Sequence, residues 1–94
     1  MSPAGGPVVR EVTIVNQRGL HARAAAKFVR TAGTFGVAVE VSRDDMTVGG
    51  TSILGLMLLA AGIGSTLTLK AEGADAEAAV AALANLVERG FDEG

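Results

Sequence analysis

Apolar and polar residues alternate in four short stretches of the chain, and this alternation predicts four β-strands. The stretches are 8–16 (VVREVTIVN), 37–42 (VAVEVS), 46–50 (MTVGG) and 65–73 (STLTLKAEG). Val12 and Ile14 share one face of the first strand, and Leu67 and Leu69 share one face of the last. Strands of this kind usually form a sheet with one buried face and one face in water.

Three other stretches repeat apolar residues at helical spacing. A first helix is expected from Ala22 to Ala32, with Gly33 ending it in a left-handed conformation. A second is expected over 52–61, ending at Gly62 and Gly64, and a third from Asp75, as its cap, to about Arg89. The apolar stripes of the first and third helices are Ala25, Phe28, Val29 and Ala32, and Ala76, Val80, Leu83 and Val87.

The element order is therefore β-α-β-β-α-β-α. It predicts an α+β fold, an open-faced sandwich in which three helices cover one face of the sheet. A chain of 94 residues forms a single domain, 1–94, and the Gly- and Pro-rich residues 1–7 are expected to be a flexible tail. A ferredoxin-like fold starts with the same β-α-β-β-α-β run and stays open as an alternative.

Composition narrows the possible functions. The net charge is −2 and the eight basic residues are scattered, which argues against a nucleic-acid partner. The chain has no cysteine and one histidine, so no metal site or other cofactor is expected. The longest apolar stretch, 53–63, is too short to cross a membrane, and the N-terminus does not resemble a signal peptide. We expect a soluble, cytoplasmic protein.

The one histidine, His21, stands at the predicted start of the first helix, within GLHAR (19–23). Helix starts carry unpaired N–H groups and positive dipole charge, so they favour an anion over an imidazolium. A phosphoryl group on His21 would be well placed there, with Arg23 close enough to contact its oxygens. Arg18 and a flexible Gly19 would keep the approach open. The alternative is that His21 merely caps the helix or lies on a surface loop.

GLHAR followed by an alanine-rich helix resembles the active centre of HPr, the histidine-containing phosphocarrier family of the bacterial phosphotransferase system. The segment TSILGLMLLAAGIGSTLTLKAEGADAEAAVAAL (51–83) is also similar, and the likeness extends from Val9 to about Val87. It implies that His21 accepts a phosphoryl group on Nδ1 from Enzyme I and passes it to IIA-type proteins. Arg23 matches the arginine that assists transfer. The resemblance also implies a monomer that carries the phosphoryl group and does not convert a substrate by itself.

Ala24 stands where the HPr family usually has proline. Proline stiffens the first turn of a helix, so alanine should alter the transfer rate or the lifetime of the phosphate while the chemistry survives. The stretches HARAAAKFV and GGTSILGLMLLAA resemble the regulatory, nitrogen-related branch more than the sugar-uptake branch. The choice between the branches stays open.

Ser52 begins the second predicted helix, where serine is a favoured cap. In many HPr proteins the matching serine is the target of HPr kinase/phosphorylase, so the resemblance implies regulatory phosphorylation at Ser52. A phosphate there would add about −1.5 to −2 charges and repel an acidic partner surface.

The helix after Ser52 is apolar on all sides, more than is needed to cover a sheet. It is either fully buried or an exposed surface for docking partners. We expect Leu56, Leu59 and Ala60 to face the core. Ile53, Leu54, Met57 and Leu58 would then be partly exposed. The expected docking residues are Ile53, Leu54 and Met57, with Leu20 and Ala24 beside the histidine.

Two other functions remain open from the residues alone. An independent enzyme could use His21 as base or nucleophile, but no Asp or Glu lies near it in sequence to orient the ring, and a chain this small offers little cleft. A ligand-binding regulatory domain of ferredoxin-like fold would not explain why His21, Arg23 and a helix start coincide.

Overall fold

A computed structural model describes residues 6–93. Its elements follow the predicted order, with one short 3-10 helix added at the C-terminal end. Residues 1–5 of the predicted tail lie outside the described residues, and Gly6 and Pro7 lead into the first strand. The elements are β1 (Val8–Thr13), α1 (Ala22–Ala32), β2 (Val39–Arg43), β3 (Met46–Gly49), α2 (Ile53–Leu58), β4 (Thr66–Ala71), α3 (Ala76–Glu88) and η1 (Gly90–Asp92).

The four strands form one sheet in the order β1-β4-β2-β3, with every neighbouring pair antiparallel. The register places Val12 opposite Leu67 and Val41 opposite Leu69. All four side chains are buried, as the alternation predicted. The strand between β1 and β2 is β4, whereas β3 occupies that place in a ferredoxin-like sheet. The ferredoxin-like alternative is therefore wrong.

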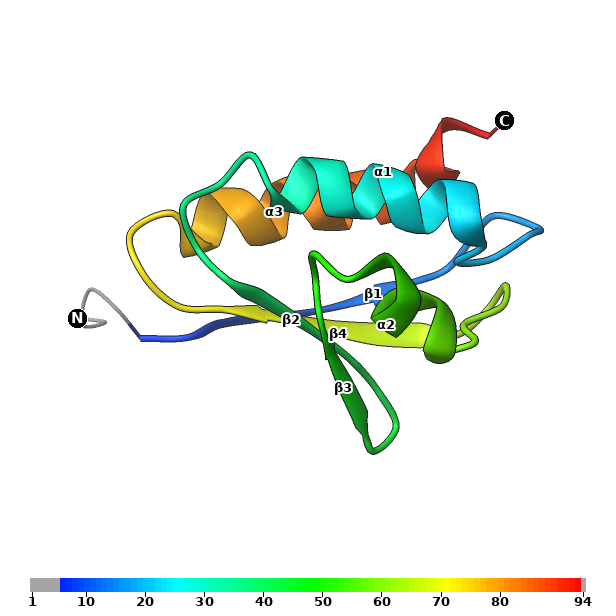
Figure 1. The fold of residues 1–94 in the computed structure, drawn as a ribbon, viewed down its shortest axis with the longest axis horizontal. Helices are drawn as coiled ribbons and strands as arrows, with labels where there is room; N and C mark the ends of the chain where they lie inside the picture. The colour runs from blue at the N-terminus through cyan, green and yellow to red at the C-terminus, as the bar shows by residue number, and fades with distance from the viewer. Residues whose placement is uncertain (1–5, 94) are drawn as a thin grey trace.

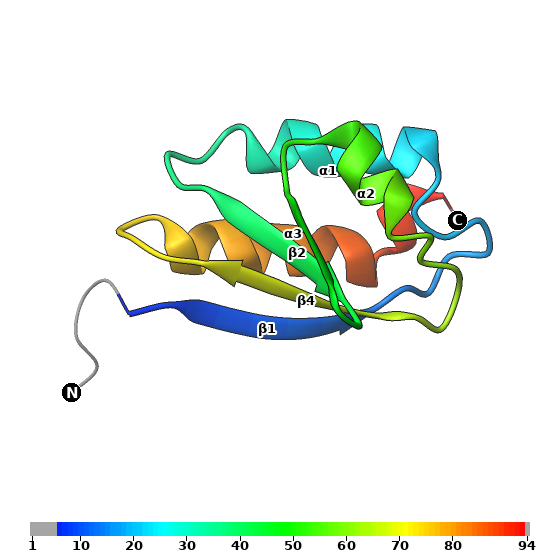
Figure 2. The ribbon, with the colours of Figure 1, turned by 60° about the horizontal axis from the view of Figure 1, so that its bottom comes forward.

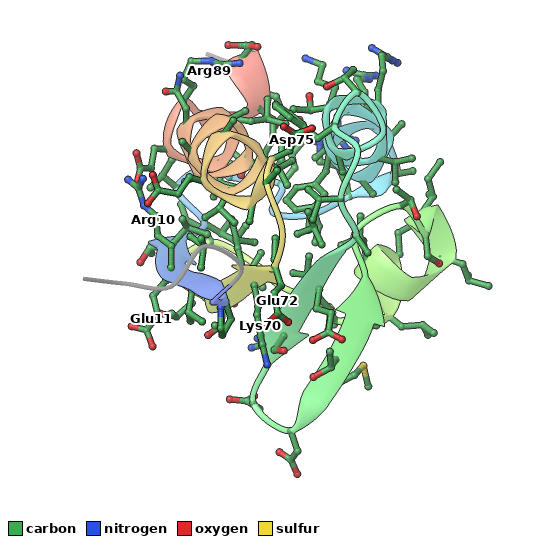
Figure 3. The ribbon with its side chains drawn as sticks, turned by 90° about the vertical axis from the view of Figure 1, so that its left-hand side faces the viewer. Arg10, Glu11, Lys70, Glu72, Asp75 and Arg89 are labelled. Atoms are coloured by element: carbon green, nitrogen blue, oxygen red, sulfur yellow. The ribbon has the colours of Figure 1, made fainter. Side chains whose placement is uncertain are left out.

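The helices lie together on one side of the sheet. α1 and α3 run next to each other across it, and the shorter α2 lies beside α1, near β3 (Figures 1 and 2). Glu11 and Lys70 are on the opposite, exposed side, as the view along the strands shows (Figure 3). The predicted open-faced α+β sandwich is confirmed.

The core between the helices and the sheet is aliphatic, apart from Phe28 and Phe91. α3 buries the stripe predicted for it, and α1 buries Ala25, Phe28 and Ala32, with Val29 partly buried. Alanines fill much of α1 and α3 where these helices face the core, which lets them lie close to the sheet.

Two helix ends differ from the prediction. Gly33 is right-handed, with φ −68°, because its N–H can still bond to the Val29 carbonyl at 2.9 Å. α2 ends at Leu58, since Ala60 takes a φ of 52° and turns the chain out of the helix. Arg43 Nη1 donates to the Leu59 carbonyl at 3.0 Å and so satisfies one of the carbonyls at this end. Ala60 is consequently exposed, and its predicted place in the core is wrong.

Within residues 6–93, none of the helices has the length and apolar character needed to pass through a membrane.

Candidate functional site

His21 is the residue immediately before α1. Its backbone is extended (φ −77°, ψ 179°), and its carbonyl accepts the first hydrogen bond of the helix, from Ala25 N at 2.8 Å. The imidazole does not cap the helix, and no other side chain of the described residues does. The first amides of α1 are thus left without an intrahelical or side-chain acceptor. The ring is partly buried, with 17% of the side chain exposed.

The imidazole is held by a carboxylate from the far end of the chain. Glu93 Oε2 contacts His21 Nε2, and Glu93 Oε1 accepts a hydrogen bond from Asn16 Nδ2 at 3.0 Å. The same Asn16 nitrogen donates to the Gly19 carbonyl at 2.9 Å. Both carboxylate oxygens are therefore engaged, one by the histidine and one by the loop that precedes it. Glu93 is 72 positions from His21 in the sequence, so the sequence alone did not identify this carboxylate.

The turn after α3 brings Glu93 to this position. Phe91 is fully buried and left-handed, with φ 56°, and its carbonyl accepts a hydrogen bond from Lys27 Nζ at 2.8 Å. Arg89 Nε donates to Asp92 Oδ1 at 2.9 Å and closes the same turn. In both ribbon views the C-terminal turn lies against the start of α1 (Figures 1 and 2). We call residues 90–93 the C-terminal strap.

The charge on Glu93 is favoured by its neighbours. The hydrogen bond to His21 lowers the pKa of the Glu93 carboxyl most, and Asn16 and the charge of Arg18 lower it further against the opposing effect of burial. An ionised carboxylate only accepts hydrogen bonds, so Nε2 of His21 must be the donor. In the neutral ring Nδ1 then keeps its lone pair. Among residues 6–93, the ring makes no other hydrogen bond.

A surface pocket of about 650 Å³ adjoins the strap. Its acidic residues already have partners: Glu88 pairs with Arg10, Asp92 with Arg89, and Glu93 with His21. Its basic residues are Arg18, Arg23, Lys27 and Arg89. Among the described residues, Arg18 and Arg23 make no ion pair or side-chain hydrogen bond. The pocket therefore offers two unengaged guanidinium groups to an anion, and Glu93, which contacts His21, also lines it.

The backbone before His21 is fixed rather than flexible. Gly19 has a φ of 64°, and a Cβ there would lie 2.8 Å from Gly62 Cα. Leu20 N donates to the Ala61 carbonyl at 2.9 Å and holds the two loops together. The glycine at residue 19 is thus required by close backbone packing rather than by flexibility, and the expectation that it keeps the approach to His21 open stays a prediction.

The surface of α2 is exposed where docking was predicted. Leu54 has 71% of its surface exposed, and Ile53, Met57 and Leu58 are also exposed, while Leu56 and Leu59 are buried. α2 is therefore not a fully buried helix. We call the exposed residues Ile53, Leu54, Met57 and Leu58 the α2 apolar surface.

Leu20 and Ala24 do not belong to that surface. Leu20 is 6% exposed and Ala24 is wholly buried, since both point into the core beneath the start of α1. Their prediction as docking residues is wrong. Ser52, in contrast, is exposed, and its Oγ accepts a hydrogen bond from Gly55 N at 2.9 Å, so its predicted role as a helix cap is confirmed.

No group of three or more His, Cys, Asp or Glu side chains that could hold a metal ion occurs in the part of the chain that the structure describes.

Comparison with known protein families identifies the family to which the chain belongs. The family model described as "PTS HPr component phosphorylation site" matches residues 8–89. The chain belongs to the HPr family. It is thus a phosphocarrier protein of the phosphotransferase system, and the family resemblance noted in GLHAR is confirmed.

Curated HPr relatives match nearly the whole chain. Phosphocarrier protein HPr of Cupriavidus necator is 49% identical over 85 residues, which cover 90% of this chain and 96% of the relative. Phosphocarrier protein NPr of Shewanella violacea is 43% identical over 84 residues, 89% of this chain and 92% of the relative. The chain is thus similar to proteins of both the HPr and the NPr name.

Solved HPr structures share the fold. HPr-C-His from Thermoanaerobacter tengcongensis superposes with a TM-score of 0.88 at 41% identity, covering 93% of this chain and 98% of that one. HPr from Bacillus anthracis superposes with a TM-score of 0.84 at 43% identity, covering 87% and 98% of the two chains.

Ala24 can now be placed where the HPr family usually has proline. Its N–H is in the first turn of α1, where it has no partner within the helix. Its methyl group is fully buried. The alanine therefore adds one backbone donor beside His21 while still filling the core.

Proposed function

We propose that His21 is the phosphorylated residue and that it carries the phosphoryl group on Nδ1 from Enzyme I to IIA-type proteins. The observation that carries this proposal is the contact between Nε2 and Glu93, which engages one ring nitrogen and leaves the lone pair on the other. His21 also lies at an uncapped helix start, where a phosphoryl group finds amide donors.

Arg23 is proposed to contact the phosphoryl oxygens. It is exposed, unengaged by acidic groups of the described residues, and two positions after His21 in the first turn of α1. A guanidinium can turn toward a dianion without losing an existing ion pair. Each exposed dipole interaction contributes about 0.3–1 kcal/mol, which steadies the group without trapping it. A carrier needs this balance because it must also release the phosphate.

The test is incubation with phosphoenolpyruvate and Enzyme I. We expect one acid-labile, base-stable label per chain, absent from His21→Ala and formed more slowly by Arg23→Ala. A label that persists in His21→Ala would refute the proposal. Conversion of a small substrate without any protein partner would favour an independent enzyme instead.

The α2 apolar surface is proposed as the docking surface for these partners. A contiguous set of exposed Leu, Ile and Met side chains is unusual on a monomer and typical of an interface. α2 lies beside α1, the helix that begins directly after His21 (Figure 2). Met57 suits a surface that must fit several partners.

Phosphorylation of Ser52 is proposed to weaken docking of Enzyme I. Ser52 is exposed and directly precedes the α2 apolar surface, so an added dianion would lie at the edge of the interface. We expect Ser52→Asp, and more strongly the protein treated with an HPr kinase, to bind Enzyme I less tightly. Thr51→Asp carries the same charge one position away and serves as the control. Equal affinities of Ser52→Asp, the kinase-treated protein and the wild type would count against the proposal.

The chain is proposed to belong to the nitrogen-related branch of the HPr family. The likeness to Phosphocarrier protein NPr and the HARAAAKFV stretch support it. We expect the labelled protein to transfer its phosphate faster to a nitrogen-related IIA protein than to a sugar-specific one. The opposite preference would assign the chain to the sugar-uptake branch.

A further inference from the structure

We infer that Glu93 is a positioning residue for phosphoryl transfer, holding the proton of His21 on Nε2 throughout the reaction cycle. The inference rests on the proposed phosphorylation of Nδ1 and extends it to a residue at the other end of the chain. It is carried by the contact between Glu93 Oε2 and His21 Nε2 and by the way the C-terminal strap is fixed.

The contact selects one tautomer of the imidazole. A free neutral imidazole can carry its proton on either nitrogen, and the hydrogen bond made by one nitrogen decides the form. Because the carboxylate only accepts, it pairs with the Nε2–H form and leaves Nδ1 as the nucleophile. A buried carboxylate plays the same part for the histidine of a Ser-His-Asp triad, although there the histidine acts as a base.

The rigidity of the strap makes the selection effective. Glu93 follows the buried Phe91 by two residues, and Lys27 holds the Phe91 carbonyl against α1. Asn16, which is 7% exposed, binds the second carboxylate oxygen and also the carbonyl of Gly19. The carboxylate is thus fixed from both sides, by α1 through the strap and by the loop that leads into His21.

The same carboxylate suits the phosphorylated ring. In the forward step the Nδ1 lone pair forms the N–P bond while the bond from phosphorus to the donor breaks, and the donor atom takes that electron pair. The ring keeps its Nε2 proton and becomes positively charged, with the Glu93 carboxylate beside it. When an acceptor attacks phosphorus, the N–P electron pair returns to the ring and restores the neutral imidazole. No proton has to enter or leave the ring in either step.

Glu93→Gln tests this role with little change of shape. We expect the Nε2 proton of wild-type His21 to give a slowly exchanging NMR signal, and imidazole ¹⁵N shifts that show a single tautomer. In Glu93→Gln, whose amide can also donate, we expect the proton signal to broaden and the Nδ1–H form to appear. Phosphoryl transfer from Enzyme I should slow about tenfold in kcat, as loss of a hydrogen bond to a charged group implies, with KM changed by less than about twofold.

Glu11→Gln is the matched control. It makes the same Glu→Gln change on the exposed face of the sheet, away from His21 and from the C-terminal strap (Figure 3). We expect its His21 NMR signature and its transfer rate to equal those of the wild type.

The outcomes separate this inference from the proposed function. A wild-type protein that acquires no label on His21 would refute the proposed function, while the tautomer spectra would still report on the Glu93 contact. If His21 is labelled and Glu93→Gln is labelled at the wild-type rate, the positioning role is overturned whatever the spectra show. A slow Glu93→Gln with an unchanged tautomer would also overturn it, because the loss would then have another cause.

Discussion

Gly19 and Ala61 lie in direct backbone contact, although Gly19 is in the loop before α1 and Ala61 is in the loop after α2. The Ala61 carbonyl accepts a hydrogen bond from Leu20 N at 2.9 Å, and a Cβ on Gly19 would clash with it and with Gly62 Cα. The loop that presents His21 is therefore braced by the loop that follows α2. Backbone contacts therefore link the loop before His21 to the loop that follows the proposed docking helix.

Gly19→Ala is expected to destabilise the protein by at least about 2 kcal/mol, from the clash and from the left-handed backbone of residue 19. Urea denaturation measures the change. Gly62→Ala is the control, because a Cβ at residue 62 meets no atom within 4 Å. It should alter stability by no more than about 0.5 kcal/mol. Equal stability of the two variants would show that the two loops can move apart.

Ser52→Ala is expected to lower the free energy of unfolding by about 1 kcal/mol, because Gly55 N loses the Ser52 Oγ acceptor at the start of α2. Ser52→Asp should keep most of this stability, since aspartate is also a favoured cap. Thermal or urea unfolding of the two variants measures the difference. If Ser52→Asp were as unstable as Ser52→Ala, a loss of Enzyme I binding in Ser52→Asp could no longer be attributed to charge.

Leu54→Ser is expected to weaken Enzyme I binding about tenfold, since burying a leucine side chain contributes about 1.5–3 kcal/mol and a tenfold change in affinity corresponds to about 1.4 kcal/mol. Its stability should change little, because 71% of the surface of Leu54 is exposed. Titration calorimetry with Enzyme I measures the affinity. Val9→Ser changes an exposed apolar residue of β1 and should leave binding unaltered. Unchanged binding in Leu54→Ser would remove α2 from the docking surface.

Acid is expected to weaken the hold of the C-terminal strap. The pKa of Glu93 is lowered in the folded protein from its ordinary value of 4.5, chiefly by the hydrogen bond to His21. Because the pKa is lower in the folded protein, the ionised carboxylate stabilises the fold at pH values above its ordinary pKa. This stabilisation is lost as the pH falls through the pKa of the folded state. The stability advantage of wild type over Glu93→Gln should therefore shrink as the pH falls from about 5 through the lowered pKa of Glu93. A constant difference across that range would show that Glu93 makes no favoured contact as an anion.

Much of the fold is predictable from the alternation of side chains. Val12, Val41, Leu67 and Leu69 are buried as their strand positions require, and the stripe of α3 faces the core. The strand order was not predictable, because the same run of elements fits a sheet with either β3 or β4 between β1 and β2. The strand order is decided only by the pairing of β4 with both β1 and β2.

The site was predictable in part. His21, Arg23 and Ser52 could be placed at helix starts from local patterns alone, and the structure places them there. Glu93 could not be found, because its contact spans 72 positions and depends on the left-handed turn at Phe91. Leu20 and Ala24 were misplaced for a related reason: proximity to His21 in sequence does not show which side of α1 they face.

The proposed function depends most directly on a phosphoryl group that bonds to Nδ1 of His21. The most direct measurement is a phosphorus–nitrogen NMR correlation on ¹⁵N-histidine-labelled protein after phosphorylation by Enzyme I. We expect the phosphorus to couple to Nδ1, with the proton still on Nε2 beside Glu93. Phosphorus bonded to Nε2, or to any residue other than His21, would contradict the account.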